Sequence, residues 1–255
     1  MTVFSDDELD RYARHIVLPQ VGGRGQAALK AARVAVVGAG GLGSPCLLYL
    51  AAAGIGQISI IDDDTVALSN LQRQVLFQTA DIGRGKVAAA VQHLGAINPH
   101  VTLVSVPQRL DAGNARALLA GHDVIADGCD SFETRLAVAD AAQALHIPLV
   151  SGAVGPFDGQ MATFRGYQPG LPCYRCLVGD AHDQAAESCA ASGVLGAMTG
   201  VIGAMMALEV LREIIGFGDT LAGRLLLYDA LGARMRTVRL PKDPACTGCR
   251  QTAVL

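Results

Sequence analysis

The sequence predicts an α/β protein with a Rossmann-like, doubly wound and mainly parallel sheet that is extended by antiparallel strands. Short Val- and Ile-rich runs alternate with helical patterns up to about residue 150, which is typical of parallel βαβ units. A turn with the pattern Gly38-x-Gly40-x-x-Gly43 joins the first of these runs to a helix. After Ser151 a long apolar segment is followed by two strand patterns, which favours an antiparallel extension of the same sheet.

The composition supports such a fold and excludes several classes of protein. The chain has 255 residues, of which 51% are hydrophobic and 17% charged, so it can bury a large core and is not disordered. Its 30 glycines indicate tight turns and close backbone approaches. A formal net charge of −3 argues against a general nucleic-acid binder, which would need a basic surplus.

The chain is expected to be cytoplasmic. Its first residues, Ser5-Asp6-Asp7-Glu8, are acidic where a secretory signal would be basic and then apolar. Its seven cysteines are an odd number without an export signal, which favours reduced thiols over disulfides. The longest apolar stretch, Val194 to Leu211, contains Glu209 and has no basic flank, so it predicts a buried helix rather than a membrane span.

The first elements form an N-terminal arm. Ser5 and Glu8 fit a capping box. Apolar residues then recur at helical spacing, which predicts one amphipathic helix ending near Pro19, with a Gly-rich linker over 21–25 behind it. The apolar face of this helix is expected to pack, and it comprises Leu9, Tyr12, Ala13, Ile16 and Val17, while the opposite face carries Arg11 and Arg14.

The remaining elements follow from periodicity and from the Gly, Pro and Asp residues that bound them. Continuous or alternating apolar runs predict strands at 33–37, 57–62, 101–106, 123–126, 148–150, 160–164, 224–229 and 235–240. Helical spacing predicts helices from the glycine turn to Gly54, at 86–96, 113–120 and 132–145, and in the apolar stretch after Gly193.

The glycine turn indicates a nucleotide site. It lies between a strand and a helix, and Asp62 ends the next strand, which is the context of the dinucleotide fingerprint. Glycines let the backbone approach a phosphate, the helix N-terminus offers free N–H groups, and Asp62 can accept a ribose hydroxyl. The alternative is a tight turn kept for packing, and the pattern leaves the kind of nucleotide open.

Two cations after the second strand point to a triphosphate. Arg73 lies in Ser69-Asn-Leu-Gln-Arg-Gln74, and Lys86 begins a helix after Gly83-Arg-Gly. Cations at this edge would neutralise a triphosphate, whereas a nicotinamide cofactor has no need of them. The alternative is that both are ordinary surface charges.

Asp130 is a candidate Mg²⁺ ligand. It lies in Asp127-Gly-Cys-Asp130, which ends the fourth strand, at the carboxyl edge of the sheet where ligands bind in such folds. A carboxylate there could hold a Mg²⁺ that bridges phosphates. The alternative is that Asp130 caps the helix over 132–145, a role to which Ser131 also has a claim.

Five cysteines are candidates for chemistry: two Cys-x-x-Cys pairs and the single Cys189. Cys173 and Cys176 share their spacing with Cys246 and Cys249, and four thiolates suit one tetrahedral, structural Zn²⁺, with redox thiols as the alternative. Cys189 lies in a polar stretch before the apolar helix, where it is either a nucleophile or a spare thiol.

Together these residues resemble the ThiF/MoeB/HesA family, the bacterial relatives of ubiquitin-activating enzymes, and most of all its molybdopterin-synthase adenylyltransferase branch. The resemblance runs from about Asp7 to Cys249. The matching features, beside the two Cys-x-x-Cys pairs, are Arg11-x-x-Arg14-His-Ile, Gly38-x-Gly-Gly-Leu-Gly43, Asp62-x-Asp64-x-Val-x-x-Ser-Asn70-Leu-Gln-Arg-Gln74, Gly85-Lys86, Asn98-Pro99, Asp127-x-x-Asp130 and Pro148-Leu-Val-Ser-Gly152.

The resemblance implies an ATP-dependent adenylyltransferase. Its substrate would be a small β-grasp sulfur-carrier protein ending in Gly-Gly, of the kind that forms the small subunit of molybdopterin synthase. The terminal carboxylate would attack the α-phosphate of ATP, giving an acyl-adenylate and pyrophosphate. The alternative is a thiazole-type or other sulfur carrier, with Cys189 forming a covalent carrier adduct.

The same resemblance assigns roles to residues. Arg14 would reach the partner subunit's site as an arginine finger, which implies a homodimer. One domain would comprise an N-terminal arm (1–30), a nucleotide-binding half (31–150) and a carrier-binding half with the zinc site (151–255). ATP would lie against the glycine turn, that is Gly38, Gly40, Gly41 and Gly43. Asp62 would bind the ribose, and the phosphates would be bound by Asn70, Arg73, Gln74 and Lys86. Asp130 would hold Mg²⁺.

Two departures from the family pattern lie beside the proposed metal ligand. Ser131 stands where the family commonly has Asn, and Cys129 where it commonly has Thr. Neither removes a charge, but both bear on contacts around the metal or the adenine. Two other functions remain open: a nicotinamide-dependent oxidoreductase, which leaves Arg73, Lys86 and the cysteine pairs unused, and a zinc-stapled module that docks a carrier without turnover.

Overall fold

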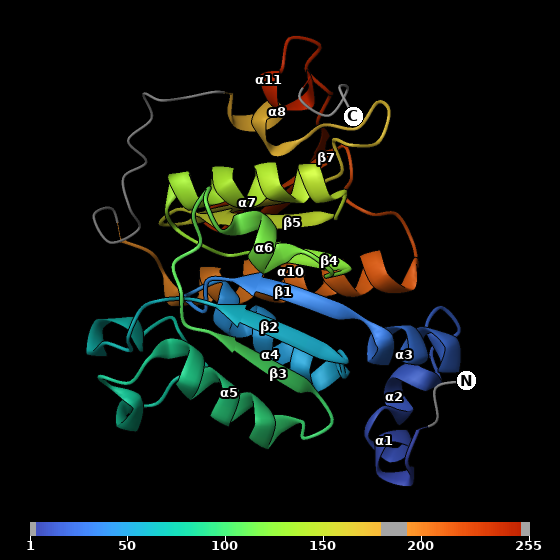
Figure 1. The fold of residues 1–255 in the computed structure, drawn as a ribbon, viewed down its shortest axis with the longest axis vertical. Helices are drawn as coiled ribbons and strands as arrows, with labels where there is room; N and C mark the ends of the chain where they lie inside the picture. The colour runs from blue at the N-terminus through green and yellow to red at the C-terminus, as the bar shows by residue number, and fades with distance from the viewer. Residues whose placement is uncertain (1–3, 180–192, 251–255) are drawn as a thin grey trace.

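The computed structural model describes residues 4–179 and 193–250, and its strands form one eight-stranded sheet in the order β3-β2-β1-β4-β5-β6-β7-β8 (Figure 1). The strands from β3 to β5 pair in parallel, and β5 to β8 pair antiparallel. This arrangement confirms the predicted fold class. The strands are β1 (Arg33–Val37), β2 (Gln57–Ile61), β3 (Thr102–Val106), β4 (Val124–Asp127), β5 (Leu149–Val154), β6 (Asp158–Phe164), β7 (Arg224–Asp229) and β8 (Arg234–Arg239).

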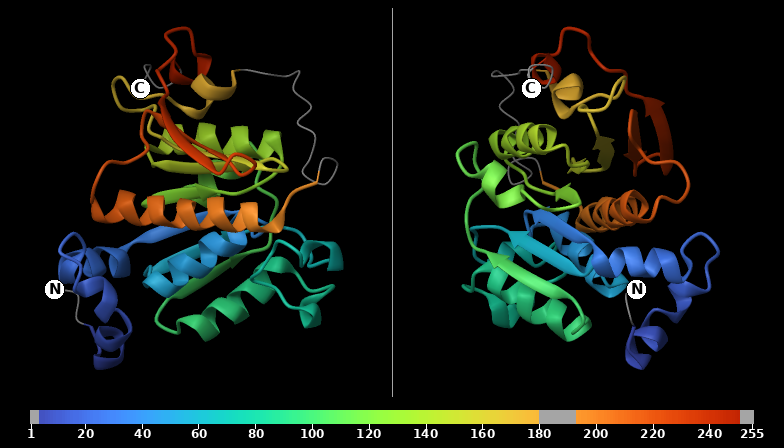
Figure 2. Two further views of the ribbon diagram at one scale, coloured as in Figure 1. Left: turned by 180° about the vertical axis from the view of Figure 1, so that it is seen from behind. Right: turned by 45° about the vertical axis from the view of Figure 1, so that its right-hand side comes forward.

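Helices cover both faces of the sheet (Figures 1 and 2). One apolar core lies between the sheet and α4 (Gly43–Ala53), α5 (Lys86–Ile97) and α10 (Gly196–Ile215). The other lies under α6 (Ala115–Leu119), α7 (Phe132–Leu145) and α8 (Tyr174–Val178). Because both faces are covered, the central parallel strands are apolar on both sides, and all four residues of β4 are buried.

The N-terminal arm differs from its prediction. Instead of one helix it holds α1 (Asp6–Arg11) and α2 (Ala13–Ile16), which are separated at Tyr12. The predicted apolar face is largely exposed, since the side chains of Leu9 and Val17 are 45% and 70% exposed and only Tyr12 is buried. The reason is that Tyr12 docks on the body of the protein, where its hydroxyl accepts a hydrogen bond from Asn98 at 2.9 Å.

The Gly-rich linker expected over 21–25 is also wrong, because these residues lie mostly in α3 (Gly22–Ala31). Gly25 faces Ile215, and a Cβ at Gly25 would come within 3.0 Å of that side chain. The glycines here therefore allow helix α3 to pack closely on α10 rather than providing a flexible connection.

Four short elements in the described part of the chain were not expected from periodicity. The segment between β2 and α5 forms two 3₁₀ turns, η1 (Leu68–Asn70) and η2 (Thr79–Asp81). The short helices α8 and α11 (Thr247–Arg250) each carry part of a Cys-x-x-Cys pair. Elements of three to five residues are too short to display a helical apolar face, so tertiary contacts rather than periodicity define them.

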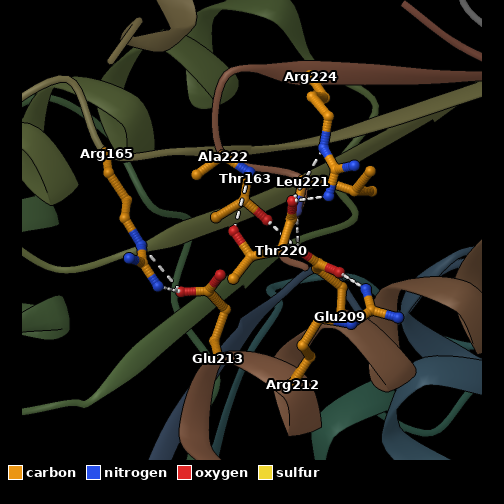
Figure 3. Close-up of polar contacts among 9 residues, drawn as sticks. All are labelled: Thr163, Arg165, Glu209, Arg212, Glu213, Thr220, Leu221, Ala222 and Arg224. Carbon is orange, nitrogen blue, oxygen red and sulfur yellow. Dashed lines mark hydrogen bonds and ion pairs between the residues drawn. The ribbon is translucent and has the colours of Figure 1, made fainter. Parts of the chain in front are cut away.

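Helix α10 contains two buried carboxylates that fix its position against the sheet (Figure 3). The Glu209 carboxylate accepts hydrogen bonds from the Thr163 hydroxyl at 2.8 Å and from the Leu221 N–H at 2.6 Å, and it pairs with Arg212. Glu213 pairs with Arg165 of the loop after β6. These partners explain why an apolar helix tolerates internal charges.

In the described part of the chain, none of the helices combines the length and the apolar character needed to cross a membrane.

Candidate active site

The predicted nucleotide turn lies at the point where the strand order of the sheet reverses. Strands β1 and β4 are neighbours but are not consecutive in the chain, so their crossover connections leave in opposite directions. In open α/β sheets ligands bind in the crevice at the carboxyl ends of such strands. The turn after β1 and the loop over 128–131 after β4 are the two sides of this crevice, and they are in contact, since a Cβ at Gly38 would lie 3.1 Å from the Cys129 nitrogen.

The glycines of the turn have different structural tasks. Gly38 has a φ of 86°, and a Cβ at Gly43 would lie only 1.8 Å from the Gly38 carbonyl oxygen. These two positions therefore keep α4 close to β1, which is the packing role considered for the motif. Gly40 and Gly41 instead bring backbone next to polar side chains, because Cβ atoms there would lie 3.7 Å from Gln74 Nε2 and 3.6 Å from Arg73 Cδ.

Asp62 is anchored beside the turn. Its Oδ2 accepts the Ala39 N–H at 2.8 Å, and its Oδ1 accepts the Asp64 N–H at 2.9 Å. Each carboxylate oxygen can accept a further hydrogen bond, so the group can still receive a ribose hydroxyl. Burial raises the pKa of Asp62, although the charge of Lys86 and the Ala39 N–H act in the opposite direction.

The segment over 64–86 brings Arg73 and Gln74 to the turn, and Asn70 lies in the same segment. Asn70 accepts the Ala67 N–H through Oδ1 at 3.1 Å, and Arg73 donates to the Ser69 carbonyl at 2.9 Å. Gln74 is 3% exposed, and its Oε1 is buried without a hydrogen-bond partner. A buried, unpaired amide oxygen is costly in a folded protein, so its position beside Gly40 fits a site completed by a polar ligand such as ATP.

Buried Asp81 holds the far end of this segment against α5. Its carboxylate pairs with Arg84 and with His93, both at 2.6 Å, and accepts the Gln78 N–H at 2.9 Å. These contacts lower the pKa of Asp81 against the opposing effect of burial, which is the largest single influence. The carboxylate thereby fixes the turn that leads directly into Lys86.

Lys86 is not an ordinary surface charge. Its residue is 5% exposed, and its Nζ donates to Asp64 Oδ2 at 2.8 Å. An ammonium group has three N–H donors, so two remain for phosphate oxygens. Arg73 lies beside Gly41 of the turn, and Lys86 lies near Asp62, which accepts the Ala39 N–H of the same turn.

The loop after β4 distinguishes between the two roles considered for Asp130, metal ligand and helix cap. Ser131 is the N-cap of α7, since its Oγ accepts the Thr134 N–H at 3.4 Å. Asp130 is exposed and is not needed as a cap. Its carboxylate stays available for a cation, and the serine that departs from the family pattern has a structural task.

Cys129, the second departure, is locked in place. Its thiol donates to Asp127 Oδ1 at 2.7 Å and its N–H to the same oxygen at 3.1 Å. Burial and then the Asp127 carboxylate raise the pKa of Cys129 well above its usual value. The thiol is therefore protonated at neutral pH and is not poised as a nucleophile.

The two cysteine pairs meet in one cluster. The Sγ–Sγ distance is 3.9 Å between Cys173 and Cys176, and 3.6 Å both from Cys173 to Cys246 and from Cys176 to Cys249. Four thiolates around one Zn²⁺ at about 2.3 Å would lie about 3.8 Å apart, so the donor set fits a tetrahedral metal site. The distances are too long for disulfides, and the cluster holds α11 against α8.

Metal analysis of the purified protein is expected to give one Zn²⁺ per chain. Chelation should lower the melting temperature, because a loss of about 3 kcal/mol corresponds to roughly 6–12 °C for a chain of this size. Cys249→Ser should lose the metal, whereas Cys189→Ser should retain it. A metal-free protein of unchanged stability would contradict the site.

Arg14 lies in α2, and the N-terminal arm that includes α2 lies beyond one end of the sheet (Figure 1). The arm that carries it packs at the C-terminal ends of α4 and α5, where Gln26 donates to the Ala53 carbonyl and Arg11 to the Ile97 carbonyl, both at 2.9 Å. The glycine turn and Lys86 lie at the N-terminal ends of these helices. Helices of 11 and 12 residues separate the two ends by about 16–18 Å.

Two residues of the site were missed by sequence reasoning, and one prediction cannot be placed. Thr199 packs against Gly41 and donates to the Arg73 carbonyl at 3.4 Å, but no sequence pattern links the start of α10 to this turn. Arg135 is buried on α7, and its helical spacing from the buried Val138 and Ala142 could have indicated that. Cys189, the possible nucleophile, lies outside the described residues.

Comparison with known proteins agrees with the geometry of the site. Residues 12–248 match the profile of the ThiF family. A sulfur carrier protein adenylyltransferase of Thermus thermophilus is 47% identical over 96% of this chain and 92% of its own length. A molybdopterin-synthase adenylyltransferase of Escherichia coli is 41% identical over 98% of this chain and 100% of its own.

A further relative and a solved structure extend the comparison. A SAMP-activating enzyme E1 of Haloferax volcanii is 42% identical over 97% of this chain and 91% of its own length. The structure of Escherichia coli MccB with ATP superposes with a TM-score of 0.81 at 21% identity, over 94% of this chain and 74% of that one. This last similarity is one of fold.

Proposed function

The chain belongs to the ThiF family, and we propose that it adenylates the C-terminal Gly-Gly carboxylate of a small β-grasp sulfur carrier of the molybdopterin-synthase type. It is an adenylyltransferase, the activity by which its near full-length relatives are named. The observation that carries the proposal is the buried side chain of Gln74, whose Nε2 lies beside Gly40 and whose Oε1 has no hydrogen-bond partner among the described residues.

In the proposed reaction a carboxylate oxygen of the carrier attacks the α-phosphorus of ATP. The bond from that phosphorus to the bridging oxygen of the β-phosphate breaks, and pyrophosphate leaves with the electron pair. The products are the carrier acyl-adenylate and pyrophosphate. Such chemistry depends on positioning and charge stabilisation more than on a general base.

The residues of the crevice supply these two requirements. The glycine turn lets the backbone before α4 approach a phosphate and offer N–H groups to its oxygens, whereas the Ser44 and Cys46 N–H groups inside α4 already donate to the Gly40 and Leu42 carbonyls. Arg73 and Lys86 would neutralise the charge that develops on the leaving pyrophosphate, while Asp62 would orient the ribose. Asp130 would hold Mg²⁺, which would offset the negative charge of the phosphates.

The proposal includes a homodimer in which Arg14 acts across the interface. Arg14 lies a helix length from the crevice of its own chain, so it can contribute only to another one. The arm also leaves Leu9 and Val17 exposed, and α10 leaves Val201 and Leu208 exposed two turns apart on one stripe. Exposed apolar side chains of this kind are typical of surfaces that a second copy covers.

The part of the sheet after residue 150 would receive the carrier. Its strands β6, β7 and β8 do not carry nucleotide ligands, and β8 is an exposed edge strand. The competing possibility is a thiazole-type carrier that forms a covalent adduct with Cys189. Neither a nicotinamide-dependent oxidoreductase nor a docking module without turnover accounts for the buried cation at Lys86.

Exchange of labelled pyrophosphate into ATP tests the proposal. Purified protein with Mg²⁺ is expected to catalyse exchange only when a carrier with an intact Gly-Gly terminus is added, and fastest with the molybdopterin-synthase type. The same carrier without its last glycine is the control. Exchange with a thiazole-type carrier alone would overturn the choice of carrier, and absence of exchange with every carrier would overturn adenylation.

The covalent alternative has its own measurement. Cys189→Ser is expected to keep full exchange with the molybdopterin-type carrier, and mass spectrometry of the parent protein is expected to detect no carrier-sized adduct. An adduct of the parent that Cys189→Ser cannot form would establish the alternative.

A further inference from the structure

The cysteine cluster is attached to α7 through the two residues that lie between its first pair of thiols. Arg175 forms a two-pronged ion pair with Asp140, at 2.8 Å through Nε and 2.7 Å through its terminal nitrogen. Tyr174 lies close to the buried guanidinium of Arg135, and both side chains line one small cavity between α7, α8 and the sheet. Gly248, between the second pair of cysteines, lies against Arg175, where a Cβ would come within 2.7 Å of the arginine Cδ. The cluster is therefore in contact with α7, the helix whose first residue, Phe132, comes two positions after Asp130.

Arg135 is a buried cation whose other partners lie at the end of β4, on β5 and in the loop over 128–131. It donates to the Cys129 carbonyl at 2.5 Å and to the Ser151 hydroxyl at 3.4 Å, and it lies 3.7 Å from Asp127 Oδ2. A buried guanidinium is stable only when its donors are paired. Tyr174 approaches this guanidinium from the side of the cysteine cluster.

The Cys129 carbonyl precedes Asp130 by one peptide bond. Asp130 is exposed, and within the part of the chain that is described its carboxylate makes no ion pair or hydrogen bond. Its position therefore depends on the backbone before it. That backbone is held at two points, by Arg135 on the Cys129 carbonyl and by Asp127 on the Cys129 N–H.

We propose that Tyr174 and Arg135 are positioning residues that couple the metal-binding cysteine cluster to Asp130 in the adenylation site. The coupling runs from the cluster to the Tyr174 hydroxyl, then to Arg135, the Cys129 carbonyl and Asp130. The metal thereby sets catalytic geometry as well as stability. The inference rests on the proposed function, because Asp130 matters in this way only if the crevice adenylates.

The competing role of Tyr174 is simple packing. Its ring meets Phe164 edge-on at a centroid distance of 5.3 Å, and the residue is 7% exposed. Packing depends on the ring, whereas positioning depends on the hydroxyl. Tyr174→Phe separates the two, because it keeps the ring and removes only the oxygen.

The test compares zinc-loaded Tyr174→Phe with Tyr167→Phe. Tyr167 is a matched control, a partly buried tyrosine that stacks on His146 and has no part in the coupling. Tyr174→Phe is expected to keep its zinc and its melting temperature. Its kcat for pyrophosphate exchange should fall about 10- to 100-fold, since displacements near 1 Å at a reacting centre have effects of this size, and it should need several-fold more Mg²⁺ for half-maximal rate.

A second readout does not depend on activity. Hydrogen–deuterium exchange at residues 128–131 should be about tenfold faster in Tyr174→Phe than in the parent, because the Cys129 N–H loses its fixed acceptor geometry. Tyr167→Phe should match the parent. Removing zinc with a chelator should accelerate the same amides in the parent but add little in Tyr174→Phe, because the coupling is already broken.

The outcomes distinguish this inference from the proposed function. If the two variants match in kcat, Mg²⁺ requirement and amide exchange, the coupling is wrong while adenylation stands. If chelation and Tyr174→Phe act additively on residues 128–131, the cluster does not act through Tyr174. If the parent protein exchanges no pyrophosphate with any carrier, the proposed function fails, and the amide exchange still decides whether the coupling exists.

Discussion

Asp130→Ala is expected to reduce carrier-dependent pyrophosphate exchange by at least about 10²- to 10³-fold, the usual effect of removing one group that stabilises transition-state charge. The variant should fold like the parent, because Asp130 is exposed and Ser131 caps α7 without its help. Steady-state exchange rates over a range of Mg²⁺ concentrations, together with thermal melting curves, test both expectations.

Glu133→Ala is the matched control for this variant. Glu133 is an exposed carboxylate in the first turn of α7, three residues after Asp130. It carries the same charge as Asp130, and the proposal gives it no role in binding Mg²⁺. It is expected to retain near-parental exchange. A folded Asp130→Ala protein with the activity of Glu133→Ala would show that Asp130 holds no catalytic Mg²⁺.

Arg14→Ala is expected to lower the rate of exchange by about 10³-fold or more. Arginine fingers contribute effects of this size to phosphoryl transfer, whereas a surface arginine contributes almost nothing. Arg14 is exposed in the described chain, so the substitution should leave the melting temperature unchanged. Arg24→Ala, which removes an exposed arginine from α3 of the same arm, is expected to retain full activity.

Mixing the two inactive proteins tests whether Arg14 acts in the partner's site. In a mixed dimer one site has its own Asp130 and the partner's Arg14, and the other site lacks both. We therefore expect part of the activity to return when Arg14→Ala and Asp130→Ala subunits exchange. Subunit exchange is verified first with tagged chains. If exchange occurs and no activity returns, Arg14 does not work across an interface.

The sequence by itself determined the features that local pattern controls. Val- and Ile-rich runs predicted β1, β2 and β4 because strands buried on both faces need apolar residues throughout. The turn over 38–43 was predictable because only glycine fits where a Cβ at Gly43 would lie 1.8 Å from a carbonyl. The two Cys-x-x-Cys pairs were predictable as one metal site because identical spacing suits a shared tetrahedral ion.

Periodicity misled where residues gain their partners from distant segments. The spacing of Leu9, Tyr12 and Val17 predicted one packed helical face, but only Tyr12 finds a place in the body of the protein, beside Gly54 and Asn98. The glycines over 21–25 indicated a flexible linker, yet helix α3 uses Gly25 to approach Ile215, which lies far along the chain.

Only the tertiary structure decided which charges are functional candidates and where they act. Lys86 and Arg135 could be surface charges in the sequence, and their burial depends on Asp64, Asp127 and Tyr174, which other elements bring to them. Arg14 was predictable as a cation but not as one at the opposite edge of its own sheet. The physical reason is that periodicity encodes which face of an element is buried, whereas the partner of a buried charge depends on how strands far apart in the chain pair and on where their crossovers turn back.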